Sequence, residues 1–188
     1  MSPARKALYI DNSNIFRGCK KSGWRPSYRK IKDFLGEEEG EECDFNVHFF
    51  ASEQEVPREK QARFYRALRS DLGFSLHTFK LAHRRVNCPA CGREEWIPTE
   101  KGVDVGLVTC LMSDLINGEF DVAFVMSSDR DYMDAIVQVK KNGKDIKIIA
   151  WKWTVTPDTV QVCRNNGIDL IFLEDHKDAF EKPQGDVL

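Results

Sequence analysis

Val122–Met126 (VAFVM) is continuously apolar and ends at the polar sequence Ser127-Ser128-Asp129. A strand that alternates apolar and polar residues has one face in water, whereas a strand without this alternation is buried on both faces. The segment therefore predicts a strand inside a parallel sheet, with helices covering both sides of that sheet.

The rest of the chain alternates between strand and helix patterns. Runs rich in β-branched and aromatic residues predict further strands at 6–10, 45–51, 75–81, 146–150 and 170–173. Apolar residues at helical spacing predict helices at 58–72, 103–116 and about 132–141, and another helix starts at Thr156-Pro157. A polar loop is expected after strand 6–10 and an irregular segment from 82 to 100. This order predicts an α/β fold, a three-layer sandwich with a central, mainly parallel sheet flanked by helices.

The length of the chain, 188 residues, favours one domain with a single core. We expect the domain at 1–175, with an insertion at about 82–100, and a loosely held tail at 176–188. No apolar run approaches the roughly 20 residues that span a bilayer. The chain is therefore expected to be cytoplasmic and without a membrane partner, with its six cysteines as reduced thiols or metal ligands.

Acidic residues flank the predicted strands at one end of the sheet. Asp11 follows strand 6–10, and Asp129 and Asp131 follow strand 122–126. Asp104 begins the helix that leads into strand 122–126. Ligands of an open parallel sheet bind outside the carboxyl ends of its strands, where the strand order reverses. We expect these four carboxylates to converge there.

Clustered carboxylates repel one another, so a site that keeps several of them ionised needs a cation. Oxygen ligands select hard ions such as Mg²⁺ or Mn²⁺, which activate water and neutralise charge on a phosphodiester. The residues thus predict hydrolysis of a nucleic-acid backbone, with a second layer of polar groups at Asn12, Asn14, Ser127 and Ser128. Each aspartate also has a structural alternative, as a helix cap, a first-turn helix residue or an Asx-turn.

The acidic residues stand in three ordered segments, Tyr9–Asn14 (YIDNSN), Glu100–Val105 (EKGVDV) and Val125–Tyr132 (VMSSDRDY), followed by Lys141–Lys144 (KNGK). These segments resemble, in order, successive motifs of the NYN domain family, in particular its LabA-like group. The resemblance covers about residues 7–173. It implies a PIN-like fold and a Mg²⁺- or Mn²⁺-dependent ribonuclease whose metal residues are Asp11, Asp104, Asp129 and Asp131. We expect an endoribonuclease acting on single-stranded RNA, with single-stranded DNA as the alternative partner.

Two positions depart from the family pattern. Cys110 stands where the family often has a further Asp, and Ser128 replaces the glycine of a usual Ser-Gly-Asp, which limits close backbone approach to an ion. Both departures favour a rival hypothesis, an inactive or weakly active NYN module that binds nucleic acid or a protein partner as a regulator. An aspartyl-phosphate hydrolase with Asp11 as nucleophile is a weaker alternative, because its expected second Asp is Ser13 here.

Basic residues are concentrated near the start of the chain. Residues 1–35 hold nine Lys/Arg and two Asp, a local charge of 9 − 2 = +7. A polyanion contact and an ordinary exposed helix side are both consistent with this charge. Trp24, among these residues, fits either base stacking or core packing. The candidate nucleic-acid contacts are Arg17, Lys20, Lys21, Trp24, Arg25, Lys101 and Arg130.

Cys88-Pro89-Ala90-Cys91-Gly92 has the spacing of a zinc knuckle, in which two thiolates of one tight turn bind the same ion. A structural Zn²⁺ site needs two further ligands, and the chain has no second CxxC. His83 is the nearest candidate, and His77, Cys43 or a neighbouring subunit of a homodimer are the other options. The alternative is a pair of reduced cysteines in a loop.

Overall fold

The computed structural model describes residues 4–38, 41–42, 45–54 and 58–183. Its centre is a six-stranded sheet of β1 (Lys6–Asp11), β4 (Phe45–Glu53), β5 (Ser75–Lys80), β8 (Val122–Met126), β9 (Asp145–Ala150) and β10 (Asp169–Phe172). The strand order is β10-β9-β8-β1-β4-β5, and every neighbouring pair is parallel. The predicted α/β fold with a central parallel sheet is confirmed.

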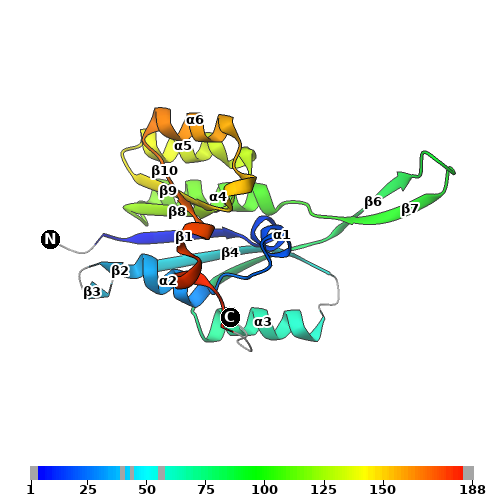
Figure 1. Ribbon diagram of the computed structural model, residues 1–188, viewed down its shortest axis with the longest axis horizontal. Helices are drawn as coiled ribbons and strands as arrows, with labels where there is room; N and C mark the ends of the chain where they lie inside the picture. Colours follow the sequence, from blue (N-terminus) through cyan, green and yellow to red (C-terminus); the bar gives the residue numbers. More distant parts are fainter. Residues whose placement is uncertain (1–3, 39–40, 43–44, 55–57, 184–188) are drawn as a thin grey trace.

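Helices cover both faces of this sheet and make three layers (Figure 1). One face carries α4 (Val103–Asn117), α5 (Met133–Lys141) and α6 (Pro157–Asn166), and the other carries α1 (Asn12–Ser22), α2 (Tyr28–Gly36), α3 (Glu59–Ser70) and α7 (Lys177–Phe180). Short 3-10 turns are η1 (Arg130–Tyr132), η2 (Lys152–Thr154) and η3 (Leu173–His176). Two apolar cores result because the central strands are buried on both sides: Leu8 packs in one core and Tyr9 in the other.

The strand order reverses between β1 and β8. The chain moves outward from β1 through β4 to β5 on one side, and from β8 through β9 to β10 on the other. Ile10 pairs with Met126, so the carboxyl ends of β1 and β8 lie next to each other. Open parallel sheets bind their ligands in the crevice at such a reversal. The sheet therefore places Asp11 and the segment after Met126 at the position where a site is expected.

The segment after β1 is a helix, and the prediction of a polar loop is wrong. α1 starts at Asn12, and the side chain of Asp11 caps it by accepting the backbone N–H groups of Ser13 and Asn14. Asp, Asn and Ser favour turns and helix N-caps alike, so composition alone does not separate the two.

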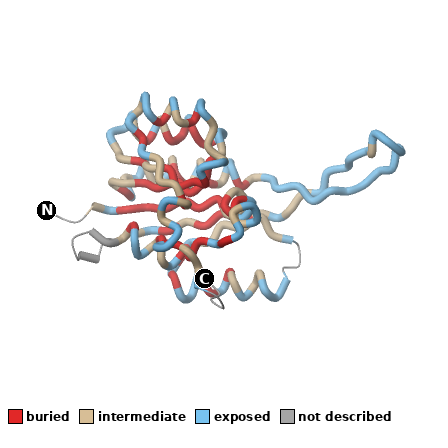
Figure 2. Tube along the Cα trace, in the orientation of Figure 1, coloured by how far each residue is buried: buried red, intermediate tan, exposed pale blue. Residues whose placement is uncertain are grey.

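Residues 82–99 form a hairpin, and the prediction of an irregular segment is also wrong. β6 (Ala82–Asn87) pairs antiparallel with β7 (Glu94–Thr99), and we call this hairpin the arm. The arm projects from the body of the molecule and is exposed along almost its whole length (Figures 1 and 2). Strands exposed on both faces lack the apolar alternation by which strands are recognised. A second, short hairpin joins β2 (Glu37–Glu38) to β3 (Glu41–Glu42).

The end of the described chain is packed against the body, unlike the loose tail predicted for 176–188. Phe180 is fully buried. The backbone N–H of Ser27 donates to the carbonyl of Phe180 (2.7 Å), and that of Lys182 donates to the carbonyl of Arg25 (2.8 Å). Residues 184–188 of the predicted tail lie outside the described residues. Among the helices of the described ranges, none combines the length and apolar character needed to cross a membrane.

Candidate active site

Three of the four predicted aspartates line one pocket beside the carboxyl ends of β1 and β8. The pocket has a volume of about 650 Å³ and is lined by Asp11, Asp104 and Asp129 among others. Asp11 is the last residue of β1, Asp104 lies in the first turn of α4, and Asp129 caps η1. Asp131 is exposed and does not line this pocket, and its backbone N–H donates to Asp129 Oδ1 (3.1 Å).

Tyr132 connects two of these carboxylates. Its hydroxyl lies 2.7 Å from Asp104 Oδ1 and 3.1 Å from Asp11 Oδ2. Burial raises the pKa of Tyr132 above its usual range, and the charge of Asp11 and the hydrogen bond to Asp104 raise it further. The phenol therefore stays protonated as a donor to the two acidic groups.

Asp11 is the most enclosed of the three aspartates, with 2% of its surface exposed. Its Oδ1 accepts the backbone N–H groups of Ser13 (3.0 Å) and Asn14 (3.1 Å) and the Ser13 hydroxyl (2.9 Å). Its Oδ2 accepts the hydroxyls of Ser127 (3.2 Å) and Tyr132 (3.1 Å). These contacts fix the carboxylate at the joint between β1, α1 and the loop after β8.

The four predicted supporting residues lie around Asp11. Ser127 and Ser128 are buried, and the backbone N–H and hydroxyl of Ser128 both donate to Asn14 Oδ1 (3.3 and 3.2 Å). Asn12 lines the pocket and accepts a long hydrogen bond from the Tyr28 hydroxyl (3.5 Å). Asn14 and Ser128 thus hold α1 against the loop that carries Asp129.

Ser52, near the end of β4, lines the pocket and is not among the residues predicted from sequence motifs. Its hydroxyl oxygen is buried and finds no hydrogen-bond partner among the described residues. A buried hydroxyl without a partner is costly, and such groups commonly complete a ligand, ion or water site. The Ser52 hydroxyl therefore adds an oxygen atom without a protein partner to the same pocket.

Positively charged side chains lie in the same pocket as the three aspartates. Arg17, Lys20 and Lys101 line the pocket, as does the ring of Phe16, which is 41% exposed. Arg17 pairs with Glu100 (3.3 Å), and the Nζ of Lys20 lies 5.0 Å from the centroid of the Phe16 ring. Cations around an exposed aromatic ring suit contacts with phosphates and a stacked base.

Comparison with known proteins gives the family of this chain. A sequence profile described as the NYN domain matches residues 5–171, nearly the whole length. The chain belongs to the NYN domain family. NYN domains are generally nucleases of PIN-like fold, so nucleic acid is the class of ligand that this family suggests.

A solved structure supports the fold of this NYN domain. It is a protein of unknown function, VPA0982, from Vibrio parahaemolyticus, with a TM-score of 0.69 and 16% sequence identity, and the match covers 95% of this chain and 96% of that one. At this identity the likeness shows the fold alone. No curated protein matches the chain.

The remaining predicted nucleic-acid residues of the NYN domain lie outside the pocket. Trp24 is buried with its ring centroid 5.0 Å from that of Trp151, so it packs in the core. The Nζ of Lys21 lies 3.9 Å from the Trp153 ring centroid, and Arg25 lies over the Phe16 ring. Arg130 pairs with Asp158 on α6 (3.3 Å). Only Arg17, Lys20 and Lys101 of the predicted set reach the pocket wall.

The two cysteines of the CxxC motif lie in the turn at the tip of the arm. The backbone N–H of Cys88 donates to the Arg93 carbonyl, and backbone N–H groups of Ala90 and Cys91 lower the pKa of the Cys88 thiol. His83 pairs with Pro98 near the base of the arm, five residues from Cys88, which is roughly 16 Å along a strand. The structure does not bring His83 or His77 to this turn, and Cys43 lies outside the described residues. Zinc binding by Cys88 and Cys91 therefore stays a prediction, with two of the four required ligands identified.

Proposed function

We propose that this NYN domain is a Mg²⁺- or Mn²⁺-dependent endoribonuclease that hydrolyses phosphodiester bonds of single-stranded RNA. The observation that carries the proposal is the convergence of Asp11, Asp104 and Asp129 on one pocket at the reversal of strand order. Asp131 lies outside this pocket and is not part of the proposed ligand set.

The donor atoms of the pocket are of the chemical type that a hard divalent ion prefers. Asp104 and Asp129 each have one carboxylate oxygen that accepts no hydrogen bond from the described residues, and the Ser52 hydroxyl is unpartnered. Carboxylate and hydroxyl oxygens suit Mg²⁺ or Mn²⁺ rather than softer metals. When bound, such an ion lowers the pKa of water and stabilises negative charge on the phosphate.

Other side chains in and around the pocket bind the RNA or hold the aspartates in position. Arg17, Lys20 and Lys101 attract and orient the RNA phosphates, and the exposed ring of Phe16 offers a stacking surface for a base. Tyr132 and Ser127 hold Asp11 in place through their hydroxyls. Unpaired bases of a single strand are free to stack on such a ring, which favours single-stranded RNA over a duplex.

The test compares two Asp→Asn variants with the same chemical change. Purified protein is incubated with end-labelled RNA and Mn²⁺ or Mg²⁺, and the products are separated by length. We expect internal cleavage that leaves a 5′-phosphate and stops in EDTA. Asp104→Asn should lower the rate by more than the roughly 10–100-fold typical of outer-shell substitutions, whereas Asp131→Asn should cleave nearly as well as wild type. Equal activity of wild type, Asp104→Asn and Asp131→Asn would refute the ligand assignment.

One observation favours a second candidate, a non-catalytic NYN module that binds nucleic acid or a protein partner. The Asp11 carboxylate lies within hydrogen-bond distance of five donors, although it has about four lone-pair sites. Asp11 is therefore satisfied by protein groups without any ion. RNA binding that persists in EDTA, together with no cleavage in Mg²⁺ or Mn²⁺, would select this candidate.

A further inference from the structure

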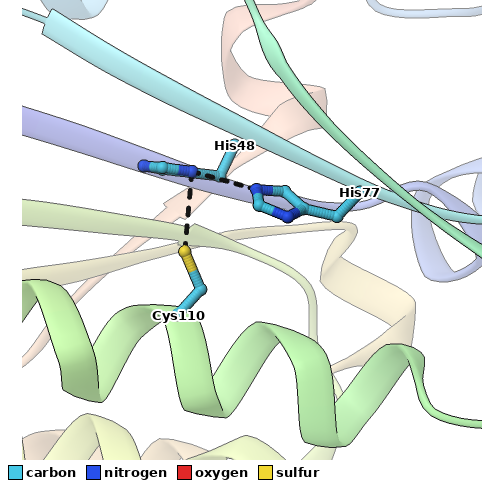
Figure 3. Close-up of side chains that lie close together, drawn as sticks. All are labelled: His48, His77 and Cys110. Atoms are coloured by element: carbon cyan, nitrogen blue, oxygen red, sulfur yellow. Dashed lines mark hydrogen bonds between the residues drawn. The ribbon is translucent and has the colours of Figure 1, made fainter.

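Among the described residues, a group of His and Cys side chains whose donor atoms lie close together is found between the sheet and α4, apart from the pocket lined by Asp11, Asp104 and Asp129, which we call the acidic pocket. His48 projects from β4, His77 from the neighbouring β5 and Cys110 from α4, and the three side chains point toward one another (Figure 3). None of the three lines the acidic pocket. We propose that this group, the His/Cys cluster, is a Zn²⁺ site.

The separations between the donor atoms suit a shared ion. His48 Nδ1 lies 3.2 Å from His77 Nε2 and 3.5 Å from Cys110 Sγ, and the three atoms lie within 4.8 Å of one another. Tetrahedral zinc, with bonds of about 2.0–2.1 Å to nitrogen and about 2.3 Å to sulfur, puts two nitrogens about 3.3 Å apart and nitrogen and sulfur about 3.6 Å apart. Two of the three edges of the ligand triangle therefore already have the lengths that zinc requires.

Groups behind the cluster orient His48 for metal binding. Asp114 Oδ2 lies 3.3 Å from His48 Nε2 and accepts the Tyr9 hydroxyl at 2.6 Å. A carboxylate on one ring nitrogen fixes the proton there and directs the lone pair of the other nitrogen toward the metal. The His48 ring also stacks on Tyr9, with centroids 5.1 Å apart, and the His77 ring stacks on Phe50 at 4.5 Å.

The charges of the cluster balance those of a divalent ion. Burial lowers the pKa of His48 and of His77, which keeps both rings in the neutral form that binds metals. Burial, with the charge of Asp114, raises the pKa of the Cys110 thiol to about 12. Zn²⁺ replacing that proton, next to one thiolate and the Asp114 carboxylate, gives a net charge of zero in a half-buried space.

Without an ion, the same side chains form a hydrogen-bonded chain. His77 Nε2–H can donate to His48 Nδ1, His48 Nε2–H to Asp114, and the thiol of Cys110 to Asp114 (3.7 Å). In Figure 3 the sulfur lies to one side of the His48 ring plane, so zinc binding includes a turn of the Cys110 side chain toward the Nδ1 lone pair. A measurement of bound zinc distinguishes the hydrogen-bonded arrangement from the zinc-bound one.

The zinc would join three elements close to the acidic pocket. Cys110 lies in the same helix as Asp104, and His48 lies in the same strand as Ser52. A bond from α4 to β4 and β5 would fix the helix against the edge of the sheet, with solvent as the fourth ligand. This zinc site does not depend on the proposed nuclease activity.

The experiment measures zinc in variants that separate the His/Cys cluster from the arm. Full-length Cys88→Ser/Cys91→Ser protein is freed of metal, given Zn²⁺ in the presence of excess Mg²⁺, desalted and analysed by elemental mass spectrometry. We expect one zinc per chain, which adding Cys110→Ser abolishes and adding Cys19→Ser, at a half-buried cysteine of α1, leaves unchanged. Co²⁺ in the same double variant should give a thiolate charge-transfer absorption that Cys110→Ser removes.

Two results would overturn the proposal: no zinc in the Cys88→Ser/Cys91→Ser protein, or full zinc retention after Cys110→Ser is added. Circular dichroism of the metal-free variants checks that each is folded. If Cys110→Ser does not fold, His77→Gln replaces it, because His77 lies on the edge strand β5. Retention of zinc by a folded His77→Gln protein likewise overturns the proposal.

Discussion

Asp11 and Asp104 face the same atom, the hydroxyl oxygen of Tyr132, at 3.1 and 2.7 Å. A phenol carries one proton, so it donates to only one of these carboxylates at a time. When it donates to Asp104, Asp11 Oδ2 still accepts the Ser127 hydroxyl, but when it donates to Asp11, Asp104 Oδ1 has no other donor among the described residues. A cation in the pocket would give Asp104 a partner in that arrangement.

Tyr132→Phe removes this shared hydroxyl and keeps the buried ring. We expect the Mn²⁺ dependence of RNA cleavage to shift to roughly 10–100-fold higher metal concentration, with a stability loss of about 1–3 kcal/mol. Titration of Mn²⁺ in the cleavage assay measures the shift. Tyr9→Phe is the matched control, because it removes the hydroxyl of another buried tyrosine, bonded to Asp114 outside the pocket. An identical Mn²⁺ response of Tyr132→Phe and wild type would contradict the role given to the hydroxyl.

Gly18→Ala tests the packing of α1 on the sheet. A Cβ at Gly18 would lie 1.8 Å from Trp151 Nε1, and Trp151 is fully buried and donates to the Ile15 carbonyl. Overpacking of this kind costs about 1–3 kcal/mol or more. In Gly106→Ala the new Cβ meets the end of the Phe79 ring, which is only partly buried. Thermal unfolding should show the larger loss for Gly18→Ala, and equal losses would show that the Trp151 contact is not decisive.

Trp96→Ala tests whether the arm takes part in RNA binding. Trp96 is 65% exposed and lies opposite Arg85, on the same face of β7 as Pro98, which lines the pocket. Loss of one base stack costs about 1–3 kcal/mol, which is roughly 5–150-fold in affinity. Fluorescence anisotropy with labelled RNA in EDTA measures the change. Ile116→Ala, an exposed residue of α4, is the control. Unchanged affinity of Trp96→Ala would remove the arm from the RNA-binding surface.

Asp121 provides a pH-dependent contribution to stability. Hydrogen bonds from Arg5, followed by that from Lys144, hold the pKa of Asp121 below its usual range. A depressed carboxyl pKa stabilises the fold above the unfolded-state value of about 3.9, and the stabilisation is lost as the pH falls below it. Because the side chain is 41% exposed, we expect Asp121→Asn to cost only about 1 kcal/mol at neutral pH. Urea unfolding at pH 7 and pH 3 should show the difference shrinking, and a constant difference would contradict this assignment.

The position of the strand Val122–Met126 was predictable because this segment is apolar throughout. Val122–Met126 has no polar position to mark a solvent face, and the structure buries four of its five residues. α1 was missed because its first turn consists of Asn12, Ser13 and Asn14, which also form turns. The arm was missed for the opposite reason: both faces of its strands are in water, so burial leaves no pattern in the sequence.

Some residues of the candidate site were predictable from the sequence and others were not. Asp11 and Asp129 were predictable because parallel strands end at the same edge of a sheet. Asp131 was predicted from the motif, but the 3-10 turn at Arg130–Tyr132 gives its backbone N–H to Asp129 and leaves its side chain outside the pocket. Ser52, Tyr132 and the His/Cys cluster depend on side chains meeting across strands and helices, which spacing along the chain does not reveal.

A crystal soaked in Mn²⁺ tests the central claim most directly. Anomalous scattering locates manganese independently of the sequence, so the ion's ligands are read from its position. We predict an anomalous peak in the pocket, with Asp11, Asp104 and Asp129 binding it directly or through water. A pocket without manganese at a concentration that supports RNA cleavage, or a peak on Asp131 away from Asp11, would contradict the shared metal site.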